Sequence, residues 1–233
     1  MPRHARLELP NVPLHVIQRG VNRGAIFVDD GDRHHFLDLL QDAARDHDLA
    51  IHAYVLMGNH VHLLVTPPET GALSGAMRRL GQCYVQAFNQ RHRRVGPLWQ
   101  GRFKSCLVES DAYLMTVYRY IELNPVRAAM AGRAESYRWS SVHANLGMHD
   151  DPIVTPHPLF LGIHSDPAQR AALYLAWLRD GVSDDDLLAL RTHLHQQRAL
   201  GSPTFQAMVE RTLGHPANVR PRGRPRCVGD EAG

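Results

Sequence analysis

The sequence predicts an α+β protein in which helices cover one face of an antiparallel sheet. Short apolar segments of strand length alternate with longer segments in which apolar residues recur every three or four positions. Gly58 and Asn59 separate two of the strand segments and form a two-residue hairpin signal, which makes those two strands antiparallel. The chain has 233 residues, of which 44% are hydrophobic. This suits one large domain, or one domain with an appendage.

The first half of the chain contains three predicted strands and one helix. In chain order these are a strand at 14–20, a helix at 32–47, a strand at 51–57 and a strand at 60–65. Gly20 and Gly24 allow a turn after the first strand, and Pro67 follows the end of the third. The helix at 32–47 therefore connects the first strand to the second.

The second half adds two helices and a fourth strand. In chain order these are an amphipathic helix at 71–91, a loop at 96–104, a strand at 105–108 and a helix from 111 to about 123. The buried stripe predicted for the long helix is Leu73, Met77, Leu80, Tyr84 and Phe88. We expect Asp111 to cap the last helix and Pro125 to end it. The order β-α-β-β-α-β-α is a ferredoxin-like split βαβ arrangement.

Composition divides the chain beyond this sheet. We predict a domain at 1–145, a linker rich in Pro, His and Gly at 146–165, a helical extension at 166–214 and a basic, disordered tail at 215–233. The tail carries four Arg in seven residues, and Arg222 and Arg224 flank a glycine as in an AT-hook, which enters a minor groove. The alternative is a tail that only improves solubility.

Positive charge is concentrated in one stretch of the chain. The net charge is only +3, but residues 70–108 contain no Asp or Glu. This stretch predicts an anion-binding surface, with the nucleic-acid backbone as the leading ligand. Its basic residues are Arg78, Arg79, Arg91, Arg93, Arg94, Arg102 and Lys104. Arg19 and Arg23, which follow the first strand, are further candidates for DNA contact.

Two aromatic residues accompany these cations. Trp99 could stack on DNA bases or anchor its loop on the core, and both interpretations stay open. For Phe103 we favour the anchoring role. If Trp99 stacks on bases, the segment combines cations for phosphates with an aromatic ring for bases.

Cysteine use and hydropathy indicate the cytoplasm. Cys83, Cys106 and Cys227 form neither a disulfide framework nor a CxxC metal motif. No apolar run approaches the ~20 residues that span a bilayer, and the first residues lack the apolar stretch of a signal peptide. We expect a cytoplasmic protein without a membrane partner.

Two histidines one residue apart form the most informative motif. His60 and His62 lie in a predicted strand, so their side chains emerge on the same face, while Val61 and Leu63 point to the core. Two adjacent imidazoles on a rigid element can grip one metal ion. The pair alone fits zinc, iron or no metal, so its function depends on a third ligand.

The helix from residue 111 supplies further chemistry. Tyr120 and Asn124 lie four residues apart and so share one helix face. An amide oxygen is a competent ligand for Mg²⁺ or Mn²⁺, and a phenol beside the metal could attack a phosphodiester. Tyr113, seven residues before Tyr120, is the rival nucleophile.

Three motifs in order carry a family resemblance. They are MGNHVH at 57–62, WQGRFK at 99–104 and RYIELNPVRA at 119–128. Together they resemble the HUH single-strand DNA transposases with one catalytic tyrosine, and most closely the subgroup of REP-associated tyrosine transposases. The resemblance covers roughly residues 10–145.

The resemblance implies a metal site, a nucleophile and a substrate. His60, His62 and Asn124 would hold Mg²⁺ or Mn²⁺, and Tyr120 would attack a phosphate of single-stranded DNA. The products would be a 5′-phosphotyrosine and a free 3′-hydroxyl, whose reverse reaction rejoins strands at hairpin-forming, REP-like elements. The active unit would be a monomer or a homodimer. Simpler relatives have Gln where this chain has Asn124, and the following Pro125 could distort the alignment of Asn124 with Tyr120.

Two other functions compete with this transposase and endonuclease activity. One is a catalytically silent DNA-binding or regulatory protein of the same fold. The other is a ferredoxin-like RNA-binding protein, with zinc or no metal, in which the histidines are incidental. Neither needs the intact set of His60, His62, Tyr120 and Asn124, so this set favours the enzyme.

Overall fold

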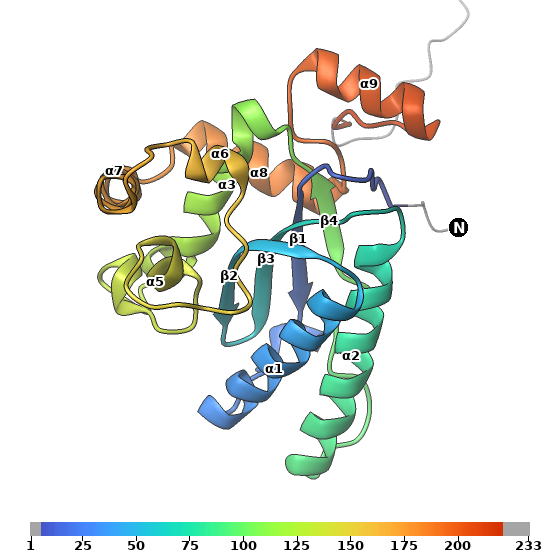
Figure 1. Ribbon diagram of the computed structural model, residues 1–233. Coiled ribbons are helices and arrows are strands. Elements are labelled where there is room, and N and C mark those ends of the chain that lie inside the picture. Colours follow the sequence, from blue (N-terminus) through green and yellow to red (C-terminus); the bar gives the residue numbers. More distant parts are fainter. Residues whose placement is uncertain (1–5, 221–233) are drawn as a thin grey trace, which may run out of the picture.

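A four-stranded antiparallel sheet forms the centre of the computed structural model, which describes residues 6–220 (Figure 1). The strands are β1 (Leu14–Arg19), β2 (Ala50–Met57), β3 (His60–Thr66) and β4 (Lys104–Leu107). Their order in the sheet is β2-β3-β1-β4. The predicted α+β class and antiparallel sheet are confirmed.

The strand register collects the polar side chains on one face of the sheet. Arg19 of β1 lies opposite His60 of β3, and Ile17 lies opposite His62. On its other side Ile17 lies opposite Lys104 of β4. Because directly opposed residues point to the same side, these five side chains share one face.

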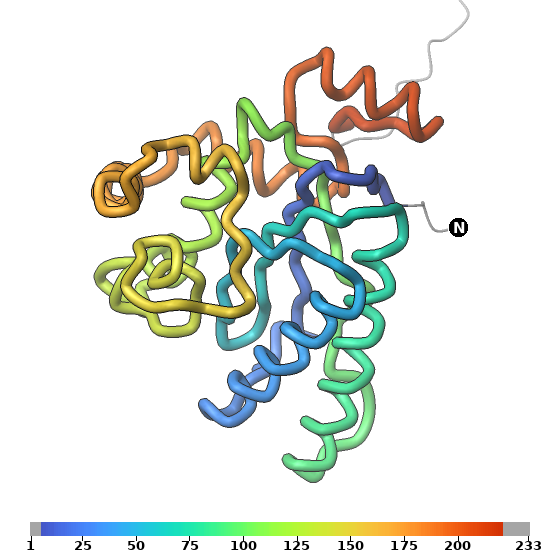
Figure 2. Tube along the Cα trace, viewed as in Figure 1, coloured from blue at the N-terminus to red at the C-terminus, as the bar shows by residue number. Residues whose placement is uncertain are grey.

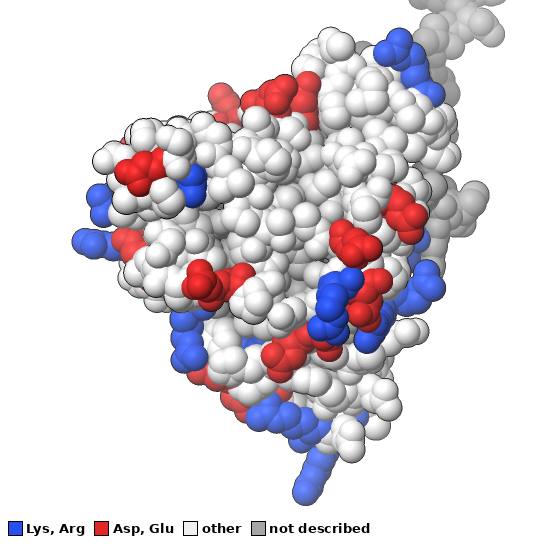
Figure 3. All heavy atoms as spheres, viewed as in Figure 1, with Lys and Arg blue, Asp and Glu red and all other residues white. Residues whose placement is uncertain are grey.

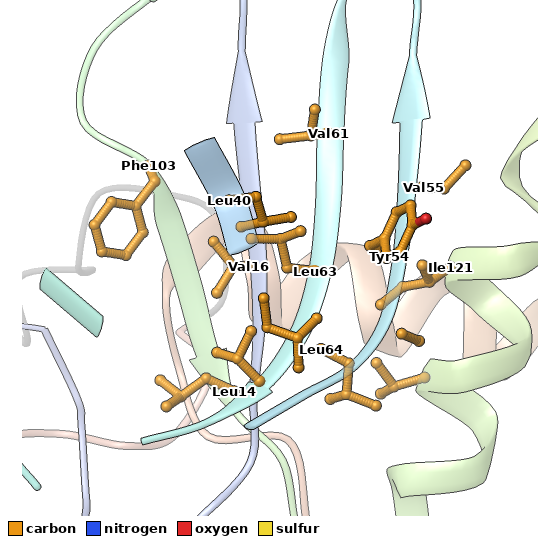
Figure 4. Close-up of a cluster of buried hydrophobic side chains, with 14 of the residues drawn as sticks. Leu14, Val16, Leu40, Tyr54, Val55, Val61, Leu63, Leu64, Phe103 and Ile121 are labelled. Carbon is orange, nitrogen blue, oxygen red and sulfur yellow. The ribbon is translucent and has the colours of Figure 1, made fainter. Parts of the chain in front are cut away.

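The helices α1 (Asp30–Asp46) and α2 (Ala72–Arg91) cover the other face. Figure 4 shows Leu14 and Val16 of β1 beside Leu63 of β3 and Leu40 of α1. All of these side chains are buried, and they form the centre of the apolar core. The predicted stripe of α2 is buried, as expected from its 3.6-residue period.

Helices also cover the polar face, where the sequence had predicted helices on one face only. Here α3 (Ser110–Glu122) packs on β2 and β3, and α8 (Asp184–Gln196) packs on β4 and β1 (Figure 1). The reason is that this face is only partly polar. Val55, Leu64 and Ile121 of α3 are fully buried there (Figure 4), and an uncovered face would expose them to water.

The start of α3 differs from the prediction. Asp111 is exposed inside the first turn, and Glu109 occupies the N-cap position. The Glu109 carboxylate accepts hydrogen bonds from the backbone N–H and the hydroxyl of Ser202, at 2.6 and 2.8 Å. The Glu109 side chain therefore contacts a distant segment and does not cap the helix, a contact that sequence patterns do not reveal.

The remaining elements are short or lie in the second half of the chain. They are η1 (Val21–Arg23), α4 (Asn124–Arg127), η2 (Ala134–Ser136), α5 (Val142–Asn145), α6 (Pro158–Leu161), α7 (Pro167–Asp180) and α9 (Pro203–Leu213). None of the helices within residues 6–220 is long and apolar enough to cross a membrane.

Two late segments pack against the sheet. Val154, in the stretch predicted as a linker, pairs with Ile51 of β2, and the yellow tube in Figure 2 passes beside that strand. Leu200 donates its N–H to the carbonyl of Leu107 at the end of β4, at 2.8 Å. The predicted domain boundaries stay predictions, but the second half of the chain contributes directly to the surroundings of the sheet.

Candidate active site

One cavity of about 580 Å³ lies on the polar face of the sheet, and we call it the site cavity. Strands β1 and β3 form its floor, α3 and α4 provide one wall, and α8 provides another. Segment 100–102 forms its rim. His60, His62, Tyr120 and Asn124 all line this cavity. Residues up to 64 positions apart in the sequence therefore meet at one place.

The first histidine of the pair has a defined free nitrogen. The Asn59 side-chain amide donates to the Arg23 carbonyl at 3.0 Å, which orients its oxygen toward His60 Nδ1 at 2.6 Å. An amide oxygen only accepts, so His60 Nδ1 carries the proton and Nε2 keeps its lone pair. Burial, and then the charge of Arg19, lowers the pKa of His60 to about 4. His60 is therefore neutral at neutral pH, and its Nε2 could hold a cation.

The second histidine is held by a third one that sequence reasoning missed. His62 Nδ1 lies 2.9 Å from Nε2 of His15, which is fully buried in β1. Burial lowers the pKa of both imidazoles, that of His15 to about 3 and that of His62 well below its usual range. Two neutral rings share one proton across this contact. When His62 donates it, His62 Nε2 is free to bind a cation.

That tautomer also sets the protonation of His15. His15 would then carry its own proton on Nδ1, which is buried without a hydrogen-bond partner within residues 6–220. His15, Ile17 and Arg19 are every second residue of β1 and so share one face. His15 lies opposite Leu64 of β3. Its spacing along β1 was visible in the sequence, but its proximity to His62 appears only once the β1–β3 register is known.

The position of Asn124 beside the end of α3 determines how its side-chain amide is oriented. Its Nδ2 donates to the carbonyls of Tyr120 and Ile121, at 3.0 and 3.3 Å, where α3 ends. Both amide protons are therefore used, and Oδ1 remains as an acceptor. Helix α3 ends before Pro125 as predicted, yet Asn124 still reaches back four residues to Tyr120.

Tyr120 is buried between the histidines and an arginine. Its ring meets those of His15 and His62 edge-on, with centroids 5.4 and 5.6 Å apart. The Arg127 guanidinium lies 4.3 Å from the Tyr120 ring centroid and donates to the Tyr120 carbonyl at 2.7 Å. A cation there stabilises negative charge that develops on the phenol. The rival Tyr113 does not line the site cavity.

The site cavity is electropositive. Arg19, Arg102 and Lys104, all expected from the sequence, line it together with Arg191 of α8. None of the described residues that line it is acidic. Burial, and then the charge of Arg19, lowers the pKa of Lys104. Such a cavity favours an anionic ligand such as a phosphodiester.

Other basic residues of the acid-free stretch are neutralised by α1. Arg79 pairs with Asp46, and Arg91 pairs with Asp29 at 2.8 Å and with Asp32 at 2.5 Å. The stretch lacks acids in sequence but meets them in space. In the view of Figure 3 the middle of the face is largely uncharged, acidic and basic side chains lie intermixed around it, and basic atoms lie at the lower tip.

The remaining residues that the sequence predicted to contact DNA divide into three groups. Trp99, Arg78 and Arg102 line a second cavity on the other face of the sheet, described below. Arg23, Arg93 and Arg94 line neither cavity, and the Arg94 guanidinium lies over the Phe88 ring at 5.5 Å. Arg222 and Arg224, with the AT-hook prediction, lie outside the described residues. Phe103 is buried, as expected for an anchor.

A metal in the site cavity would need the amide. Within residues 6–220 no group of three or more His, Cys, Asp or Glu side chains is arranged to hold a metal ion. Within residues 6–220 the hydrogen bonds described above leave a lone pair on His60 Nε2 and on Asn124 Oδ1, and His62 Nε2 also has one when His62 donates to His15. Two neutral imidazoles and an amide oxygen suit a cation that keeps further oxygen ligands, such as Mg²⁺ or Mn²⁺.

Comparison with known proteins gives a sequence family and a fold. The sequence family described as "Transposase IS200 like" matches residues 8–124, half of the chain. No match is found among curated proteins.

Two solved structures are similar to the chain. One is a REP-associated tyrosine transposase bound to a REP hairpin, with a TM-score of 0.54 and 19% identity over 68% of this chain and 93% of that chain. It shows the fold. A second structure, from Deinococcus radiodurans R1 and described as a candidate transposase, has a TM-score of 0.37 and 24% identity over 52% and 96% of the two chains.

Proposed function

Because the chain belongs to the IS200-like transposase family, a family of tyrosine transposases, we propose that it cleaves and rejoins single-stranded DNA at hairpin-forming elements. We assign it to the REP-associated type and place its activity in the cytoplasm, on nucleoid DNA. One observation carries the proposal: His60, His62, Tyr120 and Asn124 converge on one electropositive cavity, where the hydrogen bonds of the three metal-binding candidates allow each of them to offer one donor atom to a cation.

The proposed metal ligands are His60, His62 and Asn124. Their donor set fits Mg²⁺ or Mn²⁺, and the bound cation would polarise a phosphoryl oxygen of the scissile phosphate. Rigid elements support all three ligands, because β3 carries the histidines and the end of α3 holds the amide. The remaining steps belong to side chains of the protein.

Tyr120 is the proposed nucleophile. Its phenol oxygen attacks the phosphorus, the bond from phosphorus to the 3′-oxygen breaks, and a 5′-phosphotyrosine forms. The phenol loses one proton and the departing 3′-oxygen gains one, so charge and atoms balance. Arg127 beside the ring stabilises the developing phenolate, while Arg19 and Lys104 attract the phosphate.

The covalent intermediate explains how strands are rejoined. The bond from Tyr120 to the phosphate keeps the energy of the phosphodiester, so a 3′-hydroxyl can reverse the attack without ATP. The hairpin as substrate is supported by the similar structure, which holds a REP hairpin. It is supported further by the cavity between the sheet and α8, whose lining includes Arg102 and Arg191.

The experiment is a covalent-adduct assay. The protein is incubated with labelled single strands that carry REP-like hairpins, in Mg²⁺ or Mn²⁺, and adducts are separated under denaturing conditions. We expect an adduct that is lost in Tyr120→Phe and retained in Tyr113→Phe. An adduct that survives Tyr120→Phe but not Tyr113→Phe would reassign the nucleophile. Binding without any adduct would favour the catalytically silent DNA-binding protein.

A further inference from the structure

A second cavity, of about 730 Å³, lies between α2 and segment 97–103, and we call it the α2 cavity. It is on the face of the sheet opposite the histidines, because its lining includes Gln18 of β1 together with Phe36 of α1 and Leu80 of α2. Its interior is mainly apolar, and the half-buried Trp99 forms one of its walls. An apolar hollow with a partly exposed indole suits a flat aromatic ligand.

The rim of the α2 cavity is polar and positively charged. Gln82 and Gln86 lie four residues apart on α2 and are exposed, so their amides can donate to and accept from one ligand. Arg78 and Arg102 flank the opening and are exposed as well. Among the described residues that line it none is acidic, so its charge complements a phosphate backbone.

The two cavities are neighbours around the edge of one loop. Gly101 and Arg102 line both the α2 cavity and the site cavity. A strand that crosses this part of the loop therefore leaves one cavity and enters the other. The Arg102 guanidinium stands at the crossing point, where a phosphate between two nucleotides would lie.

We propose that the α2 cavity binds one unpaired base of the same DNA strand whose phosphate occupies the site cavity. The base stacks on Trp99, and the amides of Gln82 and Gln86 contact its hydrogen-bonding edge. Arg78 and Arg102 hold the adjacent phosphates. This inference rests on the proposed function, since it names how that substrate is gripped next to the cleavage site.

The test compares strands with and without bases. Tyr120→Phe protein in EDTA is titrated with a fluorescein-labelled, randomised 12-nucleotide single strand and with an abasic strand of equal length, and anisotropy gives the affinities. Gly81→Leu fills the cavity, since a Cβ at Gly81 already meets Trp99 Nε1 at 3.5 Å. Cys83→Leu adds the same side chain at an exposed position of the same helix and is the control.

We expect Gly81→Leu to bind the base-bearing strand about tenfold more weakly, as for the loss of one stacked base, and the abasic strand as before. Cys83→Leu should match the parent protein on both strands. The proposal is overturned if Gly81→Leu leaves the base-bearing affinity intact, or weakens both strands equally. The latter result would indicate that the cavity contributes to contacts with the sugar-phosphate backbone and not with a base.

A second pair of variants covers a folding defect in Gly81→Leu. Trp99→Leu should lose the preference for bases and Trp99→Phe should recover most of it, because phenylalanine still offers a ring for stacking. Equal affinities of these two variants for the base-bearing strand would also overturn the proposal. The adduct assay with Mg²⁺ or Mn²⁺ is a separate measurement, so a failure of this inference leaves the proposed chemistry of Tyr120 standing.

Discussion

The two faces of the sheet use the same four strands for opposite purposes. His62 and Leu63 are neighbours in β3 and both are buried, yet one points to the site cavity and the other to the core beneath α1 and α2. The polar face carries three imidazoles, of which His15 and His62 are buried and His60 is half-buried, and this burial keeps them neutral. The apolar face buries leucines and valines and supplies stability. Alternation along a strand thus lets one rigid element serve both roles without either disturbing the other.

The largest expected effect separates these roles on the polar face. His62→Ala should lower the rate of adduct formation more than about 100-fold. This exceeds the loss of about 10- to 100-fold that is usual when a residue that only hydrogen-bonds to a metal ligand is removed. It should also abolish Mn²⁺ binding, because only two of the three proposed ligands remain. The adduct assay measures the rate, and calorimetric titration with Mn²⁺ measures metal binding. A thermal melt checks that the variant is folded. Wild-type adduct formation in this variant would remove His62 from the site.

The matching change on the apolar face is Leu63→Ala. We expect a loss of about 2–5 kcal/mol in the free energy of unfolding, because the cavity left in the core cannot close fully. Denaturant titration measures it. Below the unfolding transition the variant should still form the adduct. Its loss in fully folded protein would mean that the two faces are not independent.

His15 tests how the polar face is organised. His15→Leu removes the acceptor for His62 and should lower Mn²⁺ affinity by about 10- to 100-fold. His15→Gln keeps an acceptor and should recover most of the affinity. Calorimetry compares the two variants. If both bind Mn²⁺ as the parent protein does, His15 only fills space.

A smaller effect concerns Glu122, which connects α3 to the second half of the chain. Its carboxylate accepts from Ser141, Asn145 and Tyr174, and burial nevertheless raises its pKa above the usual range. A raised folded-state pKa stabilises the fold most below the unfolded pKa, and this stabilisation is lost as pH rises through the folded pKa. Glu122→Gln should remove that decline.

Thermal melts from pH 4 upward would measure the Glu122 effect. The parent protein should lose stability relative to Glu122→Gln as the pH rises. A constant difference between the two at every pH would show that Glu122 has the same pKa in both states.

The smallest effect distinguishes free from paired cations. If the bound protein neutralises ~6 phosphates, a plot of the logarithm of single-strand affinity against the logarithm of salt concentration has a slope of about −4. Arg102→Ala should make the slope shallower by about 0.7. Arg79→Ala should leave it unchanged, because Asp46 already neutralises Arg79. Equal slopes for both variants would contradict this assignment.

What could be predicted from the sequence follows the local periods of strands and helices. The period of two placed His60 and His62 together, and the period of 3.6 placed Tyr120 and Asn124 together. The buried stripe of α2 followed from the same reasoning. These features need only neighbours in the chain.

What could not be predicted depends on contacts between distant segments. His15 approaches His62 through the β1–β3 register, and Arg91 meets Asp29 through the packing of α1 on α2. The Glu109 carboxylate, at the N-cap position of α3, accepts from Ser202, which is 93 residues away. Arg127 lies three residues after Asn124 in sequence, but only the turn of α4 brings it over the Tyr120 ring.

The position of α8 has a consequence for how such a protein can change. Arg191 and His195 of α8 wall the site cavity, and Lys104 of β4 donates to the His195 carbonyl at 3.4 Å. The two halves of the chain therefore cannot be exchanged freely between relatives. A hybrid that joined a new second half to this sheet would inherit a different wall around Tyr120, so recombination after residue 145 would alter the site cavity as well as the extension.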